Sequence, residues 1–239
     1  MKALLLSAAR TLSIAEIDTP SPGVGEVLVR VAACGICGSD VHGFTGATGR
    51  RIPPLVMGHE AAGTVAAVGE GVDDLPPGTR VALDSTVHCG RCEYCQSGRE
   101  NLCSDRQVLG VSCGTYRRHG CFAEYVCVPR RILHRIPDSV GFVAAALLEP
   151  LTIALHAVNL AAAGPQTRSA VVVGAGTIGL ALVAALRARG VRRIAAIDLD
   201  ATRLEHARRL GATDVFPAGD EAGRLAADWG RGSADADGA

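Results

Sequence analysis

The stretch Val171-Val172-Val173-Gly174-Ala175-Gly176-Thr177-Ile178-Gly179 decides the fold of the second part of the chain. Its three branched apolar residues predict an apolar strand, and the Gly-x-Gly-x-x-Gly pattern after them is typical of a strand-to-helix turn that binds a dinucleotide. An acidic residue, Asp198, stands 19 residues beyond Gly179, at the end of a second apolar run. Strand, turn, helix and acid together predict the adenosine half of a Rossmann domain.

Each glycine of this turn has a predicted role. Gly174 allows the tight bend, Gly176 lets the backbone approach a pyrophosphate at the helix N-terminus, and Gly179 permits close packing. Asp198 is expected to accept hydrogen bonds from the adenosine ribose and to disfavour a 2′-phosphate, which predicts NAD rather than NADP. The motif residues that complete the predicted cofactor-binding set are Thr177 and Ile178. The alternative is a glycine-rich packing turn without a nucleotide.

The character of the sequence changes near Glu149-Pro150. Before it, short β-rich runs separated by Gly and Pro predict a barrel-like β unit; they cover residues 26–31, 61–68, 80–83 and 122–128. After it, alternating helix and strand patterns predict the start of a βαβ domain; they cover residues 151–163, 170–173, 178–189, 193–197, 213–216 and 221–229. We therefore expect an α/β plus β protein with domains at 1–148 and 149–239.

Composition excludes several classes of protein. The 239 residues carry 24 basic and 24 acidic side chains and are 48% hydrophobic, which argues against a disordered chain and against a basic nucleic-acid-binding protein. The apolar N-terminus is short and is interrupted by Arg10, so no signal peptide is expected. The longest uncharged stretch, 169–186, is interpreted as strand, turn and helix rather than a membrane span. We expect a cytoplasmic protein.

The nine cysteines favour metal binding over disulfides, because their number is odd and several stand two residues apart. The clearest group is Cys89-x2-Cys92-x2-Cys95-x7-Cys103. Four thiolates at this spacing can surround a tetrahedral Zn²⁺ and leave no position open for a substrate. The group therefore predicts a structural zinc site; the alternatives are four unrelated buried cysteines or disulfides.

A second group combines Cys37, in Cys37-Gly-Ser-Asp-Val-His42, with His59 and Glu60. A mixed Cys, His and carboxylate set, delivered from two turns at the ends of predicted strands, is typical of a catalytic zinc site. Asp40 is a candidate partner for the ligating histidine. Cys34 and Cys37 could instead be a redox pair, but the βαβ context for one is absent, and Cys34 is interpreted as a small buried residue. Alone, His59 or Glu60 would more often be structural.

The order of these motifs, with Glu149-Pro-Leu151 between the four cysteines and the glycine turn, resembles the zinc-dependent medium-chain dehydrogenases and, within them, the sorbitol (polyol) dehydrogenase branch. The resemblance implies an N-terminal GroES-like catalytic domain and an incomplete Rossmann domain. It also implies that Cys37, His59 and Glu60 bind the catalytic zinc. Glu149, which matches a carboxylate near the metal or its water, stands where alcohol dehydrogenases have a second cysteine, and this shifts the expected substrate towards polyols.

The resemblance implies roles for three further residues. Ser39 and His42 match a proton relay, although His42 could also be a solvent-facing loop residue, and Arg203 matches a basic residue beside the adenosine ribose. The implied reaction transfers a hydride from a secondary alcohol or sorbitol-like polyol to NAD, with two zinc ions per chain. Neither a nucleic acid nor a membrane is expected as a partner.

Members of the family continue beyond the length of this chain, so it is interpreted as C-terminally truncated, with the nicotinamide half of the sheet missing. Full-length members are expected to form homo-oligomers, and this chain alone is expected to be a poor catalyst or none. The alternative function is a non-catalytic zinc-stabilised domain that binds a partner chain through the open edge of its sheet.

Overall fold

The computed structural model describes residues 1–219 and residue 223. The chain divides into two units, Met1–Glu149 and Pro150–Ala239, and each is described by itself. The helix predicted over 221–229 lies outside the described residues. Among the described helices, none has both the length and the apolar character needed to cross a membrane.

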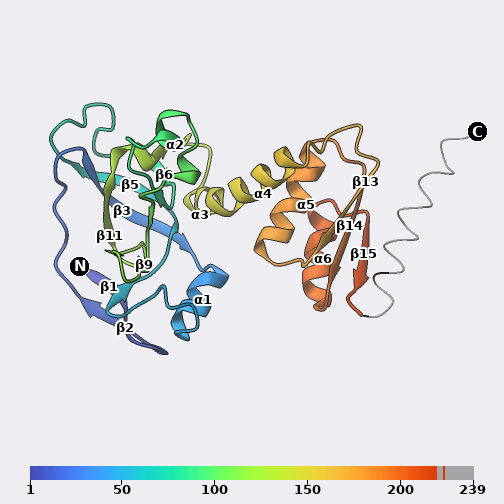
Figure 1. Ribbon diagram of the computed structural model, residues 1–239, viewed down its shortest axis with the longest axis horizontal. Coiled ribbons are helices and arrows are strands. Elements are labelled where there is room, and N and C mark those ends of the chain that lie inside the picture. The colour runs from blue at the N-terminus through green and yellow to red at the C-terminus, as the bar shows by residue number, and fades with distance from the viewer. Residues whose placement is uncertain (220–222, 224–239) are drawn as a thin grey trace, which may run out of the picture. The chain divides into compact units, whose positions relative to one another are not determined.

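The first unit is rich in short strands (Figure 1). Its strands are β1 (Lys2–Ala8), β2 (Thr11–Glu16), β3 (Glu26–Gly35), β4 (Leu55–Val56), β5 (Glu60–Val68), β6 (Arg80–Leu83), β7 (Thr86–Val87), β8 (Gln107–Val108), β9 (Val111–Ser112), β10 (Arg117–Arg118), β11 (Tyr125–Pro129) and β12 (Leu133–Arg135). Its helical elements are α1 (Gly38–Phe44), α2 (Glu93–Gln96), η1 (Glu100–Leu102), η2 (Arg130–Ile132), α3 (Phe142–Ala146) and the start of α4 (Leu148–Leu160).

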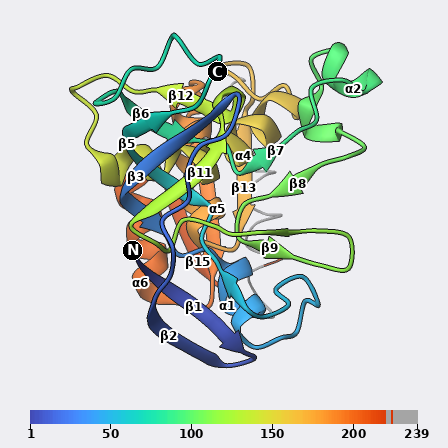
Figure 2. The same ribbon diagram turned by 90° about the vertical axis from the view of Figure 1, so that its left-hand side faces the viewer.

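An antiparallel sheet of five strands, in the order β11-β3-β5-β6-β12, is the centre of this unit (Figure 2). Branched apolar side chains of its strands are fully buried, among them Val27 and Val29 of β3, Val65 of β5 and Val81 of β6. Burial of such side chains is the main stabilising contribution, at roughly 1.5–3 kcal/mol each.

The structure confirms the predicted mixed fold class and all four predicted strands of this unit, which appear as β3, β5, β6 and β11. Two features differ from a simple barrel-like β unit. The described strands form four separate sheets, none of which closes on itself, and short helices interrupt them. The motif around Cys37 lies on one of these helices, α1, rather than in a turn.

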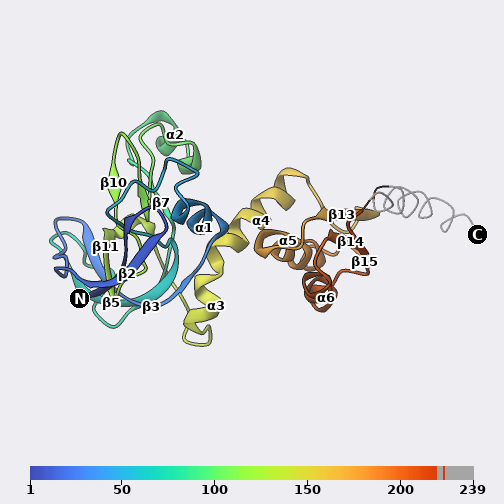
Figure 3. The same cartoon turned by 90° about the horizontal axis from the view of Figure 1, so that it is seen from below.

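The second unit contains a parallel sheet in the order β13-β14-β15, formed by Ser169–Val173, Arg193–Asp198 and Asp214–Pro217. Helices α5 (Thr177–Ala188) and α6 (Ala201–Leu210) connect these strands and contact each other on one face of the sheet (Figure 3). This is the outcome expected when successive right-handed crossovers advance in one direction. Apolar residues of α4, α5 and the sheet form its core.

Strand β13 lies at the edge of the described sheet. Val172 is buried, whereas Val171 and Val173 are 43% and 79% exposed. Strands of doubly wound parallel sheets are normally buried on both faces. The exposure of these two valines is therefore an unusual feature of the described part of this unit.

Candidate zinc and nucleotide sites

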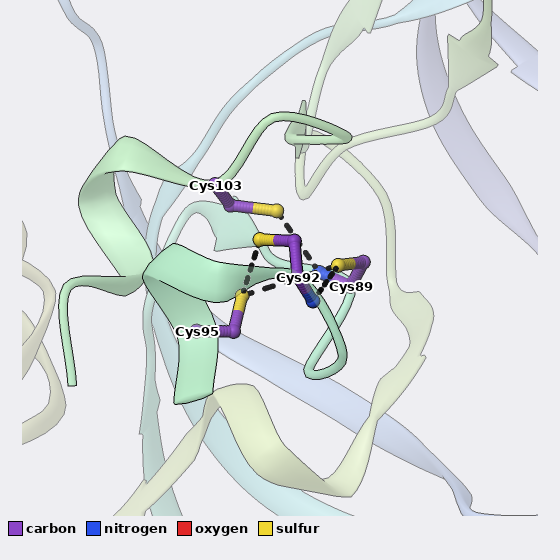
Figure 4. Close-up of side chains that lie close together, drawn as sticks. All are labelled: Cys89, Cys92, Cys95 and Cys103. Carbon is purple, nitrogen blue, oxygen red and sulfur yellow. Dashed lines mark hydrogen bonds between the residues drawn. The ribbon is translucent and has the colours of Figure 1, made fainter. Parts of the chain in front are cut away.

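Four cysteine sulfurs face one another in a small lobe of the first unit (Figure 4). Cys89 lies in the loop after β7, Cys92 is the N-cap of α2, Cys95 lies within α2, and Cys103 follows η1. The sulfurs of Cys92 and Cys95 are 3.5 Å apart, and those of Cys89 and Cys95 are 4.0 Å apart. Zn–S bonds of about 2.3 Å in a tetrahedron separate sulfurs by roughly 3.8 Å. The lobe therefore has the dimensions of a Cys₄ zinc site.

Backbone N–H groups of this lobe favour thiolates. The N–H groups of Cys92 and Cys89 lie 3.3 Å from the sulfurs of Cys89 and Cys103, respectively. Backbone N–H groups of Cys95 and Ser104 lower the pKa of Cys92 to about 5. Burial and the neighbouring thiols instead raise the pKa of Cys95 to about 12. A bound zinc ion would offset the repulsion between neighbouring thiolates, because zinc binds cysteines in the thiolate form.

The second cluster brings together Cys37, His59 and Glu60, whose potential ligand atoms all lie within 4.8 Å of one another. Cys37 is the N-cap of α1, His59 lies in the turn between β4 and β5, and Glu60 is the first residue of β5. His59 and Glu60 are 7% and 4% exposed. A thiol, an imidazole and a carboxylate supply three ligands, which leaves room for the open position of a catalytic zinc.

Asp40 connects helix α1 to His59. Its Oδ2 accepts a hydrogen bond of 3.1 Å from the Cys37 N–H, and its Oδ1 lies 3.6 Å from His59 Nδ1. Burial alone would raise the pKa of Asp40, but His59 and the Cys37 N–H outweigh it and lower that pKa. Asp40 Oδ1 and His59 Nδ1 are buried without a hydrogen-bond partner. A metal on Nε2 would direct the Nδ1–H towards this carboxylate, so the residues fit a zinc ion.

Two residues that sequence reasoning missed shape this cluster. A Cβ on Gly35 would lie 2.3 Å from Glu60 Oε2, so a larger residue there would displace the Glu60 carboxylate from its position. The Ser85 hydroxyl donates a 2.7 Å hydrogen bond to Glu149 Oε1. Burial raises the pKa of Glu60, and the nearby charge of Glu149 adds to this. Glu149 is thus close enough to act on the cluster electrostatically, although it is not one of its three members.

The two predicted relay residues both lie on α1, three positions apart. The Ser39 hydroxyl is half-buried and accepts a hydrogen bond of 3.3 Å from Arg51 Nη2. His42 is exposed, and its carbonyl accepts a hydrogen bond from Thr45 Oγ1. In the described part of the chain, Ser39 and His42 share no hydrogen bond. Residues at i and i+3 of a helix are neighbours, so a relay between them would need a bridging group.

The glycine turn joins β13 to α5. Gly174 has a φ of +90°, which favours glycine, and Gly176 is the N-cap of α5. Thr177 and Ile178 are the first, exposed residues of that helix. Gly179 packs against the turn, because a Cβ there would lie 1.8 Å from the Gly174 carbonyl oxygen.

Asp198, at the end of β14, binds this turn directly. Its Oδ2 accepts a 2.6 Å hydrogen bond from the Ala175 N–H, and its Oδ1 accepts one of 2.9 Å from the Asp200 N–H. These two N–H groups lower the pKa of Asp198, and Arg203, with Nη1 at 3.9 Å, contributes to the shift. The structure therefore brings together the glycine turn, Asp198 and Arg203.

Alanine at Gly179 is expected to destabilise the second unit by about 1–3 kcal/mol or more, because it places a methyl group against backbone. Alanine at Gly176, where a Cβ would have no neighbour within 4 Å, is expected to cost at most about 1 kcal/mol, because alanine is a poorer N-cap than glycine, and to weaken nucleotide binding. Urea unfolding and nucleotide titration measure the two effects. Equal stability losses in both variants would contradict this account of the turn.

Zinc at Cys37, His59 and Glu60 is expected to be lost on acidification. Burial alone would lower the pKa of His59, but Asp40 outweighs it and raises that pKa above its ordinary value. The ring therefore accepts a proton at a higher pH than a free histidine. Affinity should be full above this raised pKa and fall below it, which competition with a chromogenic chelator from about pH 8 to about pH 5 would measure. A zinc affinity that does not change between about pH 8 and about pH 5 would contradict the assignment.

Comparisons with known proteins identify the family to which this chain is similar. Residues 23–138 match the family description "Alcohol dehydrogenase GroES-like domain". The chain is 40% identical to a sorbitol dehydrogenase of Bacillus subtilis over 90% of its own length and 61% of the relative's. It is 38% identical to an L-idonate 5-dehydrogenase of Vitis vinifera, covering 88% of the chain and 57% of the relative. The chain thus spans about 60% of the length of these curated relatives.

Two solved structures are similar over nearly the whole chain. The NADH complex of rspB from Escherichia coli has a TM-score of 0.87 and 37% identity, covering 96% of this chain and 66% of that one. A zinc-binding dehydrogenase from Sinorhizobium meliloti bound to NADP has a TM-score of 0.83 and 38% identity, covering 92% and 63%. Structures this similar thus carry either of the two nicotinamide cofactors.

Proposed function

We propose that this chain, which belongs to the zinc-dependent alcohol dehydrogenase family with an N-terminal GroES-like domain, contributes the zinc sites and the adenosine-binding part of an NAD-dependent polyol dehydrogenase. The observation that carries the proposal is the cluster of Cys37, His59 and Glu60, with its ligand atoms within 4.8 Å of one another and Glu149 nearby. The proposed reaction oxidises a secondary alcohol or sorbitol-like polyol.

A zinc ion held at this cluster would supply a Lewis acid that lowers the pKa of the substrate hydroxyl, and NAD would supply the hydride acceptor. Cys37, His59 and Glu60 would hold the metal, and Asp40 would orient the His59 ring. Glu149, held by the Ser85 hydroxyl, would add a carboxylate at the metal or its water. A carboxylate at this place, instead of a second thiolate, supports a polar, hydroxyl-rich substrate.

Ser39 is the proposed first member of a proton relay, in which its Oγ accepts the proton of the substrate hydroxyl as its own hydroxyl proton passes on towards His42. Its Oγ already accepts a hydrogen bond from Arg51 Nη2, which leaves the hydroxyl proton free to point elsewhere. His42 is exposed and can pass the proton to solvent. The spacing of the two residues on α1 supports transfer through a bridging substrate hydroxyl or water.

The glycine turn is the proposed pyrophosphate site. Gly174, Gly176 and Gly179 shape the turn, and the N–H groups at the start of α5, including those of Thr177 and Ile178, would face the anion. Asp198 and Arg203 would lie beside the adenosine ribose. Because Asp198 also binds the Ala175 N–H, the same carboxylate would couple ribose recognition to the shape of the turn.

Replacing Asp198 by asparagine is expected to narrow the preference for NAD over NADP by about tenfold, equivalent to ~1.4 kcal/mol. The negative carboxylate repels a 2′-phosphate, whereas the amide does not, and its oxygen can still accept the Ala175 N–H. The ratio of kcat/KM for the two cofactors, measured on the gene product that contains this chain, gives the change. An unchanged ratio, or a parent that prefers NADP, would contradict the role.

The function itself is tested by NAD reduction with a panel of polyols and simple alcohols, again with the gene product that contains this chain. Polyols are expected to be oxidised with higher kcat/KM than ethanol, and Cys37→Ser is expected to abolish the reaction. Oxidation of ethanol in preference to polyols would contradict the substrate class. Full activity of Cys37→Ser would contradict the proposed metal centre.

The alternative of a non-catalytic zinc module has no support of its own, since the matched relatives are named dehydrogenases. The odd number of cysteines and their two-residue spacing favour metal binding over disulfides, which supports the cytoplasm as the proposed location. A small-molecule alcohol and the nucleotide are the proposed ligands, and homo-oligomer formation stays a prediction from the family.

A further inference from the structure

Arg51 places a charged guanidinium inside the first unit, where it is only 9% exposed. Its Nη2 lies 3.3 Å from Ser39 Oγ and 3.7 Å from Asp40 Oδ1, and its Nη1 donates to the carbonyl of Arg50. A buried charge is costly unless it is paired. Both side-chain partners are on the first turn of α1, so the charge is paired with residues next to the proposed zinc ligand Cys37.

Strand β9 holds the backbone around Arg51. Arg51 forms a parallel bridge with Ser112 of β9. The Ser112 N–H donates to the Arg50 carbonyl at 3.2 Å, and the Ile52 N–H donates to the Ser112 carbonyl at 3.1 Å. The guanidinium therefore links α1 to an anchored strand segment.

Gly43 provides the space through which the Arg51 side chain passes. A Cβ on Gly43 would lie 2.2 Å from Arg51 Cγ and 3.1 Å from its Cβ. Gly43 follows Ser39 by four residues and Asp40 by three, so all three lie on one face of α1. The Arg51 stem thus crosses the helix at Gly43, and its charged end reaches one turn back.

We propose that Arg51 is a positioning residue that fixes the first turn of α1, so that Ser39 is aligned for proton transfer and Asp40 for orienting His59. The inference rests on the proposed function, because it assigns Arg51 a task in that same site. Arg51 acts through its two partners and does not touch the substrate. Gly43 is also required for this arrangement, since any side chain there would displace the Arg51 side chain.

The test compares Arg51→Met and Arg51→Lys with the exposed neighbour Arg50→Ala as the matched control, in the gene product that contains this chain. In the metal-free protein, Arg51→Met is expected to speed hydrogen exchange of the α1 amides several-fold. Zinc affinity at Cys37, His59 and Glu60 is expected to fall about 10- to 100-fold, the usual effect of losing a residue that orients metal ligands. Arg51→Lys should retain only part of the parent's zinc affinity, because a lysine lacks the planar guanidinium that can contact Ser39 and Asp40 together.

Kinetics separate positioning from a purely structural role. Arg51→Met is expected to lower kcat more than it changes KM, because proton transfer depends on the orientation of Ser39. Faster exchange in α1 with unchanged zinc affinity and unchanged kcat would overturn the positioning role. The same is true if Arg51→Met behaves like Arg50→Ala in every measurement.

A double-mutant cycle with Gly43 tests the contact itself. Gly43→Ala is expected to reproduce the losses of Arg51→Met. Gly38→Ala, where a Cβ would have no neighbour within 4 Å, should not speed exchange in α1, because alanine is the better helix former. In an Arg51→Ala background, Gly43→Ala should add little, because the colliding side chain is gone. Additive effects of the two substitutions would overturn the proposed contact.

Failure of this inference and failure of the proposed function can be told apart. If the parent protein takes up zinc only at the four cysteines, the proposed function fails, and exchange in the metal-free protein still decides whether Arg51 fixes α1. If the parent takes up two zinc ions and Arg51→Met loses neither zinc affinity nor kcat, the proposed function stands and the inference fails.

Discussion

Cys95→Ser is expected to cost the first unit most of its stability, whereas Cys37→Ser removes one metal and leaves the fold intact. In the lobe formed by residues 88–106, Cys103 alone is buried, so this segment has no apolar core of its own. Segments of this kind depend on metal for their structure, and structural zinc contributes up to about 10–16 kcal/mol in isolated zinc-finger peptides. Serine at position 95 removes a ligand from the centre of the cluster.

Limited proteolysis and thermal unfolding, combined with zinc analysis, measure this effect. The matched control is Cys113→Ser, because the Cys113 thiol is half-buried and contacts Thr115 rather than either cluster. The control should resemble the parent protein. Parent-like stability of Cys95→Ser would show that the lobe does not need a metal.

The second large effect concerns turnover by residues 1–239 assayed alone. We expect zinc uptake and weak adenosine-nucleotide binding but negligible polyol oxidation. Ligands of doubly wound sheets bind at the switch point where the strand order reverses, and the described strands follow one direction, β13-β14-β15, without a reversal. Alignment of the reacting carbons lowers the activation free energy by about 7–11 kcal/mol, and most of this contribution is lost when the alignment is lost.

NAD reduction by the purified polypeptide measures this, with binding of an adenosine nucleotide as the control that the second unit is folded. A rate of roughly 1 per second or more, typical of an enzyme, would contradict the expectation. It would mean that another surface, such as a second copy of the chain, completes the nicotinamide site.

Short-range spacing predicts much of this molecule. The cysteine spacing correctly groups four sulfurs that the structure places together, and the glycine pattern correctly predicts the turn between β13 and α5. Both signals are contained in fewer than about 20 consecutive residues, within which the chain itself limits the geometry. The strands of the central sheet also follow from alternating and apolar runs.

Other features depend on information that local patterns do not carry. Ser85 meets Glu149 across 64 positions of sequence. Arg51 meets Ser39 across only 12 positions, but no motif links the two residues. Cys34, expected to be buried, is half-buried against the core. Local propensity does not favour helix α1, because Gly38 and Ser39 are weak helix formers; the Asp40 carboxylate that accepts the Cys37 N–H stabilises its start.

Helix α6 is a different case, since its signals are visible in the sequence. Asp200 accepts hydrogen bonds from the N–H groups of Thr202 and Arg203, and Gly211 ends the helix with a φ of +115°. An acidic N-cap and a glycine beyond the last turn are a recognisable pair of boundaries. The same segment follows Asp198, so the helix also holds Arg203 near the proposed ribose site.

The central claim is that this chain binds two zinc ions in sites of different kinds. Zinc content per chain after zinc-replete expression tests it most directly, with Cys37→Ser measured in parallel. Two zinc ions in the parent and one in the Cys37→Ser variant are the predicted result, because the closed Cys₄ lobe retains its metal and the open site does not form without its thiolate. No more than one zinc ion in the parent would contradict the claim.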